Sequence, residues 1–422
     1  MIGSGVFRVP AAVAAYTGSP AVMLLVWVAG GLVALCGALS LAEVAALFPR
    51  AGGMYVYLRE AYGPLTAFLF GWLYLIVLPA GAGAIALVFA EYLSRLVPLS
   101  PAQVRAVAAG LIVLLGAAQY RSLRFGAAIQ NVSTVAKLLA ILALTVTAFV
   151  LGPATGARLP GDTLHATTWG GFGLGMVTVL WAYNGWQDVT CLSGEVRDPR
   201  TALPRALVGG TLTVMAVYLL ANAAYLHVLP LTAIGASPLV ASDVAVRLIG
   251  PAGSAIVAAL VCVATFGSLN AVIMAVPRVF WAMADDGLFF RFVAAVHPRY
   301  RTPHMAITAM AVLSVVYLAL QSFEQLIEGF ILASLPFWAL SVASVLVFRR
   351  TRASATRLYR TPGYPAVPIL FVAAMTMLVA NSLAAHPAST IVSLGAIAAG
   401  VPLYYGWRRF RRRPAAGERD GA

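Results

Sequence analysis

The first residues of the chain combine types that favour an interrupted helix with types that could bind an anion. Gly3 and Gly5 flank Ser4 at the head of an apolar segment. Glycine leaves helical dihedral angles at low cost, and unwound backbone at membrane depth persists only where it lines a cavity. The freed N–H groups of Ser4, Gly5 and Val6 would begin the next helix, and a helix N-terminus suits a carboxylate. A flexible glycine-rich terminus, or a helix thinned for packing, is the alternative.

Lys137 is the only lysine of the chain, and it lies within the apolar segment 131–142. A cation inside a membrane span is costly and marks a functional site unless the side chain snorkels to the headgroups. Lys137 lies far along the helix from Gly126, near the start of the apolar run, so its side chain would have a long way to reach the headgroups. Burial disfavours the charged form of a lysine, so Lys137 could carry a coupling proton or act as a fixed charge in place of a metal ion.

A second interruption is expected in the segment 181–188, Trp-Ala-Tyr-Asn-Gly-Trp-Gln-Asp, where glycine, an amide and a carboxylate break an apolar run. Aromatic residues beside such a break can close over a small ligand. Gly185 and the released carbonyl groups can accept hydrogen bonds from an ammonium group. Asp188 either contributes to that site or faces water near the end of the span. The charged stretch 195–200 either closes a gate or is solvated.

Composition indicates where these segments reside. Of 422 residues, 61% are hydrophobic and 10% are charged, and apolar runs of about 20 residues recur along the chain. We therefore predict an all-α polytopic membrane protein and exclude a soluble globule. The net charge of +14 arises from arginines in short loops and the tail, so nucleic-acid binding is not expected.

Metal, cofactor and enzymatic chemistry are not expected either. Cys36, Cys191 and Cys262 lack the spacing of a metal site or a disulfide framework. No nucleophile, base and orienting residue occur at a recognisable spacing.

Hydropathy predicts twelve membrane helices, the first about half as long as a span. Either the protein begins with a re-entrant segment, or its true start lies upstream of Met1, which is the interpretation we favour. Arginines occupy alternate loops and the C-terminal tail, so these are expected in the cytoplasm of a multi-pass cell-membrane protein. The predicted helices are 6–17, 20–48, 64–94, 102–120, 127–151, 169–194, 203–227, 251–284, 304–321, 325–348, 365–384 and 389–407.

The broken first and sixth helices begin two blocks of five spans. Discontinuous helices at matching positions indicate an inverted-repeat transporter with its site at the bilayer midplane. The expected divisions are a first repeat at 1–152, a second at 153–350, and two further helices with a basic tail at 351–422. The fifth helix then brings Lys137 towards the first and the eighth.

Short motifs follow one another along nearly the whole chain, each weak alone but specific in order and spacing. They are Met1–Phe7, Ala42-Glu43, Phe48–Tyr55, Tyr62–Pro64, Ala136–Leu138, Ala182–Trp186, Gly194-Glu195, Asp198-Pro199, Leu203-Pro204, Gly267–Asn270, Arg278, Asp286-Gly287 and Tyr359–Pro365. By these motifs the sequence resembles the amino acid, polyamine and organocation (APC) superfamily, and within it the L-type amino acid transporter-like bacterial permeases.

The resemblance implies a LeuT-like fold of 5+5 inverted repeats, with twelve transmembrane helices of which the first is truncated at its N-terminus. It implies a substrate carboxylate bound by backbone N–H groups after Gly3 and an α-ammonium bound by carbonyls near Ile2 and in the sixth helix. Trp181 would be an aromatic gate, and Lys137 would contact the first helix as in sodium-independent members. The expected substrate-binding residues are Ile2, Gly3, Ser4, Gly5, Val6, Trp181, Ala182, Tyr183, Asn184, Gly185 and Gln187.

The resulting functional prediction is a secondary active transporter that moves amino acids by alternating access. An apolar pocket floor, for which Phe266, Asn270 and Phe337 are candidates, favours neutral amino acids. Transport is expected to be sodium-independent, as proton symport or exchange, with the amino acid, protons and the lipid bilayer as partners. A polyamine or organocation carrier and a non-transporting sensor are the alternatives. The particular amino acid and the oligomeric state are left open.

Overall fold

The structure is a computed structural model that describes residues 1–3, 5–153, 168–237, 239–320, 323–385 and 387–412. Within this part of the chain every regular element is a helix and no strand occurs. Helices satisfy their own backbone hydrogen bonds, which a bilayer interior requires. The prediction of an all-α polytopic architecture is confirmed at this level.

Among the described residues, nine helices have 17 or more residues. They are α2 (Pro20–Leu47), α4 (Pro64–Leu93), α5 (Pro101–Arg121), α6 (Leu123–Leu151), α8 (Pro199–Val228), α11 (Ala252–Asp285), α12 (His304–Leu320), α13 (Phe323–Thr351) and α14 (Ala366–Ala385). The shorter elements are α1 (Gly5–Tyr16), α3 (Met54–Tyr62), α7 (Trp169–Tyr183), α9 (Leu231–Ala236), α10 (Val240–Ile249), α15 (Pro387–Ala398), α16 (Gly400–Arg412) and the 3₁₀ helices η1 (Asp188–Glu195) and η2 (Arg291–Ala294).

Local sequence fixes where several helices begin. Proline occupies the first turn of α2, α4, α5 and α8, where its missing N–H costs nothing. The Ser19 side chain accepts a hydrogen bond from the Val22 N–H at 3.3 Å. Ser100 and Gln103 form a reciprocal capping box at the start of α5.

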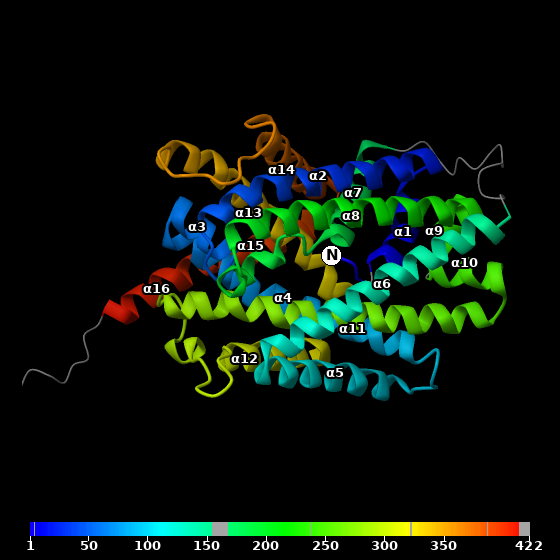
Figure 1. The fold of residues 1–422 in the computed structure, drawn as a ribbon, viewed down its shortest axis with the longest axis horizontal. Coiled ribbons are helices and arrows are strands. Elements are labelled where there is room, and N and C mark those ends of the chain that lie inside the picture. The colour runs from blue at the N-terminus through cyan, green and yellow to red at the C-terminus, as the bar shows by residue number, and fades with distance from the viewer. Residues whose placement is uncertain (4, 154–167, 238, 321–322, 386, 413–422) are drawn as a thin grey trace, which may run out of the picture.

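The long helices run side by side along the long axis of the molecule (Figure 1). α3 and α16 lie at one end of the bundle, and α9 and α10 lie at the other. The first residue lies in the middle of the bundle, between these ends. Nine helical segments of the described chain are long and apolar enough to cross a membrane, and α1 and α12 are shorter apolar helices.

Small residues allow these helices to pack closely, as they do in membrane bundles generally. A Cβ on Gly37 of α2 would lie 2.6 Å from the Phe371 ring of α14, and one on Gly31 would lie 2.8 Å from Met215 Cγ of α8. These approaches pack α2 against α8 and α14. α1 and α7 contact each other, and both also contact α2.

The structure corrects some details of the predicted elements. α3, α9 and α10 were not predicted, because each is too short to form a membrane span. The predicted final span, 389–407, comprises two helices, α15 and α16. The predicted break in 169–194 is confirmed, since α7 ends at Tyr183 and η1 begins at Asp188. The twelve-span inverted repeat and its divisions stay predictions.

Candidate functional site

The two predicted helix breaks meet in the interior. A Cβ built on Gly5, the first residue of α1, would lie 2.7 Å from the Cα of Ala182 in α7. Only glycine permits this backbone contact. Gly185 has φ +94°, a left-handed conformation that L side chains rarely adopt, and it turns the chain between α7 and η1.

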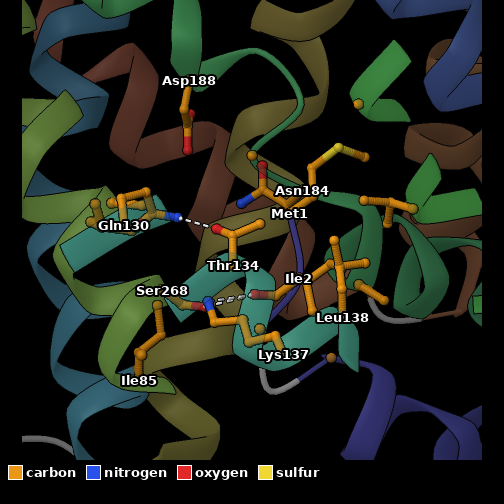
Figure 2. Close-up of a pocket in the computed structure, with 18 of the residues that line it drawn as sticks. Met1, Ile2, Ile85, Gln130, Thr134, Lys137, Leu138, Asn184, Asp188 and Ser268 are labelled. Carbon is orange, nitrogen blue, oxygen red and sulfur yellow. Dashed lines mark hydrogen bonds between the residues drawn. The ribbon is translucent and has the colours of Figure 1, made fainter. Parts of the chain in front are cut away.

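A cavity of about 400 Å³ opens beside these breaks, a size typical of small-molecule sites. Its walls come from the start of the chain, α4, α6, α7, the loop to η1, α8 and α11 (Figure 2). The lining residues are Met1, Ile2, Gly3, Gly5, Ile85, Gln130, Thr134, Lys137, Leu138, Trp181, Ala182, Asn184, Gly185, Asp188, Gly210, Thr213, Val214, Ser268, Ala271 and Val272.

Lys137 lies in one wall of this cavity and is only 3% exposed. Its Nζ donates to the backbone oxygen of Ile2 at 2.9 Å and to Ser268 Oγ at 3.2 Å. Ser268 Oγ also lies 3.0 Å from the same Ile2 oxygen. Figure 2 shows the three groups converging, with Asp188 across the cavity. The cation therefore connects α6 to the start of the chain and to α11, which is the position predicted for it.

Other polar groups of the unwound segments already have partners. The Tyr218 hydroxyl lies 3.1 Å from Met1 O and 3.2 Å from Ala182 O, and Asn184 N donates to Trp181 O at 3.1 Å. A carbonyl oxygen has two lone pairs. These carbonyls therefore retain capacity for a further donor, such as an ammonium group.

A second cavity of about 40 Å³ adjoins the first. The two share Ile85, Trp181, Asn184, Asp188 and Val272. The remaining lining residues of the small cavity are Tyr74, Leu78, Gly81, Gln187, Ser334 and Trp338. Gln187 Nε2 donates to Asn184 Oδ1 at 3.1 Å. The small cavity is thus a mostly apolar extension that a substrate side chain could occupy.

Most residues predicted from sequence surround these cavities. Val6 and Tyr183 do not line either one: Val6 is fully buried in the core, and the Tyr183 hydroxyl donates to Trp27 O at 3.2 Å. Ser4 lies outside the described residues. The residues that do line a cavity are Ile2, Gly3, Gly5, Trp181, Ala182, Asn184, Gly185, Gln187 and Lys137.

The suggested pocket floor was wrong in its residues. Phe266, Asn270 and Phe337 line neither cavity. Asn270 is buried away from them, where it accepts from Gln119 Nε2 at 2.8 Å and donates to Gly126 O at 2.9 Å. Phe337 packs against Phe70 with ring centroids 5.7 Å apart.

Sequence reasoning missed several lining residues. Gln130, Thr134 and Lys137 recur at helical spacing on one face of α6, and Gln130 Nε2 donates to Thr134 Oγ1 at 3.2 Å. That periodicity was a usable signal. Ile85, Ser268 and Thr213 carried no comparable signal. Asp188, for which two roles were left open, lines both cavities.

A third cavity of about 460 Å³ contains ion pairs. Arg278 Nε lies 3.1 Å from Glu195 Oε1, and Arg59 Nη1 lies 2.6 Å from Asp286 Oδ1. The Tyr55 hydroxyl donates to Asp286 at 2.9 Å. Burial raises the pKa of the Asp286 carboxyl, whereas the Tyr55 hydrogen bond and the Arg59 charge oppose this rise. The charged stretch that begins at Glu195 is therefore bonded to α11.

Comparison with known proteins gives a consistent result. A family model described as amino acid permease matches residues 1–401. The serine/threonine exchanger SteT of Bacillus subtilis is 31% identical, over 97% of this chain and 94% of that protein. The human b(0,+)-type amino acid transporter 1 is 30% identical over 92% of this chain and 80% of its own length. The human cystine/glutamate transporter is 29% identical, over 96% and 82% respectively.

Proposed function

The chain belongs to the amino acid permease family, and from that premise we propose that it carries amino acids across the membrane by alternating access, binding them where the breaks beside α1 and α7 meet. The single observation that carries this proposal is the 400 Å³ cavity lined by both unwound segments. Unwound backbone in a membrane protein is expected only at such a cavity.

The proposed substrate pose follows from the chemistry of the cavity walls. The N-terminus of α1 at Gly5 carries partial positive charge, which suits the carboxylate of an amino acid. The carbonyl oxygens of Met1 and Ala182, which lie near the single Tyr218 hydroxyl, are acceptors for the α-ammonium group. The side chain would enter the smaller cavity, whose Leu78 and Trp338 favour an uncharged substrate.

We further propose that transport is sodium-independent. Lys137 places its cationic head between the start of the chain and α11, bonded to Ile2 O and Ser268 Oγ. A cation there would repel a sodium ion and occupy its volume. The charge of Lys137 can hold the start of the chain and α11 together in place of a metal ion. This role fits either exchange or proton symport.

Asp188 favours a second candidate, a carrier of cationic amino acids or polyamines. Its carboxylate lies in both cavities, and it is near the Gly185 turn, where a Cβ would lie 3.3 Å from Asp188 Oδ2. A half-buried carboxylate that lines a cavity is a natural partner for an ammonium group. This geometry gives less support to the alternative that Asp188 only faces water near the end of the span.

Uptake into proteoliposomes tests the proposal directly. The purified chain should accumulate or exchange amino acids from a mixture, with the same result when choline replaces sodium. Uptake that requires amino acids preloaded inside indicates exchange, and uptake driven by an inward proton gradient indicates symport. Preference for putrescine over neutral amino acids, abolished in Asp188→Asn, would support the second candidate instead. No saturable uptake of any of these compounds would contradict both.

The helix breaks are tested by a pair of glycine variants. Gly5→Val should lower substrate binding at least tenfold while the protein still inserts, because the added side chain collides with the Ala182 backbone and blocks the carboxylate site. Gly110→Val is the matched control, since nothing lies within 4 Å of a Cβ on that glycine of α5. Isothermal titration calorimetry should show weaker substrate binding by Gly5→Val than by Gly110→Val. Equal affinities would remove Gly5 from the site.

A further inference from the structure

A groove between α5 and α12 is unrelated to the central cavities. These helices pack together at one edge of the bundle (Figure 1). The groove has a volume of about 670 Å³. Its walls include Val113, Val312 and Val316, which are 58%, 56% and 45% exposed. Exposed aliphatic side chains on a membrane helix indicate that the groove opens towards lipid.

The hollow results from small residues on both helices. Gly116 and Ala117 of α5 face Ala311 of α12. A Cβ on Gly116 would be only 3.4 Å from the Ala311 Cβ, so the helices are already close at this level. The groove therefore results from small side chains on two closely packed helices, and its floor is apolar. We call this apolar floor the α5–α12 channel.

Aromatic and basic groups form one end of the groove. Tyr120, Arg121 and Tyr300 line it there. Thr302 Oγ1 donates to Tyr120 O at 2.7 Å, and the Tyr120 and Tyr300 ring centroids are 6.0 Å apart, so the loop before α12 is fixed to the end of α5. Tyrosine rings of this kind lie at the membrane–water interface.

The elements that form this end contribute positive charge and no acidic residue, and the nearest carboxylates, Asp285 and Asp286, line the neighbouring cavity with Arg301 and Pro303. Residues 94–126 and 288–320 contain no aspartate or glutamate. Arg121 is exposed and forms no ion pair within the described part of the chain. The Arg299 guanidinium lies 5.7 Å from the Tyr300 ring centroid, which adds a second cation beside the groove.

We propose that this groove binds an anionic phospholipid, with one acyl chain along the α5–α12 channel and the phosphate beside Arg121. The apolar channel matches the chain in polarity. Guanidinium groups bind phosphate strongly through parallel N–H donors. The aromatic end places the headgroup at interfacial depth. The combination selects an amphiphile with negative charge over either an apolar molecule or a soluble anion.

Native mass spectrometry of the purified full chain tests this assignment. The protein in detergent would be incubated with dioleoyl phosphatidylglycerol, dioleoyl phosphatidylcholine or glycerol 3-phosphate. Phosphatidylglycerol should be retained preferentially, and glycerol 3-phosphate should not be retained. Arg121→Gln should weaken phosphatidylglycerol binding about fivefold, the loss expected for one basic residue at an anionic lipid surface.

Two further variants separate the groove from general surface charge. Arg105→Gln, exposed near the other end of α5, should leave lipid retention unchanged. Ala311→Leu fills the channel and should reduce retention of both phospholipids. Equal effects of Arg121→Gln and Arg105→Gln would overturn the proposal. So would an Ala311→Leu protein that retains both lipids as well as the parent chain does. If that variant also associates with itself less than the parent chain in the same detergent, the groove holds a second copy of the chain.

Discussion

At the scale of single residues, Lys137 is a buried and hydrogen-bonded polar group beside the proposed site. It is 3% exposed and donates to Ile2 O and Ser268 Oγ. A hydrogen bond from a charged donor contributes about 1.5–3 kcal/mol, and the bond to Ile2 positions unwound backbone that has no helical partner. A change at Lys137 should therefore act on the geometry of the start of the chain as well as on charge.

We expect Lys137→Ala to reduce uptake at least tenfold. The variant loses a hydrogen bond from a charged donor, which contributes about 1.5–3 kcal/mol to the stability of the substrate-bound state. Proteoliposome uptake in choline buffer measures this without any contribution from sodium. Asn131→Ala is the matched control on the same helix, because Asn131 is exposed and lines neither cavity. If only gradient-driven accumulation is lost, Lys137 carries the coupling proton; if exchange slows equally, it is a fixed charge. Normal transport by Lys137→Ala would contradict the proposed role of this lysine. Loss of wild-type uptake when choline replaces sodium would contradict it as well.

At the scale of elements, a buried charge cluster joins α2 to the region around α13 and α14. Glu43 of α2 is 3% exposed and accepts from Arg349 Nε and Nη2, both at 2.8 Å. It also accepts from the Thr361 N–H at 2.8 Å, and Arg357 Nε lies 3.0 Å from it. The carboxylate is thus paired on both oxygens. Such a cluster fixes one arrangement of the three segments.

Glu43→Gln should lower the free energy of unfolding by about 3–5 kcal/mol, because it leaves buried arginine charge without its partner. Glu60→Gln is the control: Glu60 pairs with Arg50 and Arg352, both at 2.7 Å, but the arginines are about half exposed. Its loss should cost about 1 kcal/mol or less. Thermal unfolding of both variants in the same detergent makes the comparison. A similar shift for the two would mean that the Glu43 cluster is not a stabilising clamp.

At the scale of the whole molecule, the arginine-bearing loops gather at one end of the bundle. α3, α16 and the loop before α12 lie at that end, and α9 and α10 lie at the opposite end (Figure 1). The positive-inside rule therefore predicts that the α3 end is cytoplasmic. The ion pairs Arg59–Asp286 and Arg278–Glu195 belong to this end, between the proposed site and the expected cytoplasmic surface.

Thiol labelling in intact cells tests the orientation. Ala102→Cys, exposed at the start of α5, should react with a membrane-impermeant maleimide from outside. Ser354→Cys, exposed between α13 and α14, should react only after permeabilisation. The parent chain sets the background, since its cysteines are buried or half-buried. The opposite pattern would invert the topology and place the two ion pairs on the external side.

The sequence by itself determined the features that depend on local composition. Apolar runs gave the spans, proline and serine gave helix starts, and glycines with polar neighbours gave the breaks at Gly5 and Gly185. These features were predictable because each depends on residues within a turn or two. Most predicted helix boundaries agree with the structure to within a few residues. The exceptions are 169–194, where α7 ends at Tyr183, and 389–407, which comprises α15 and α16.

Only the tertiary structure decided which residues share a cavity. Ile85, Thr213 and Ser268 come from three helices, and nothing in their own segments indicates that they line the same cavity as Ile2. The motifs around Glu43 and Thr361 were visible in the sequence, but their contact across more than 300 positions was not. Hydropathy sets how deep a residue lies, whereas the rotation and packing of each helix depend on the small residues of its neighbours. For this reason Asn270 and Phe337 fell outside the cavity, and Asp188 fell within it.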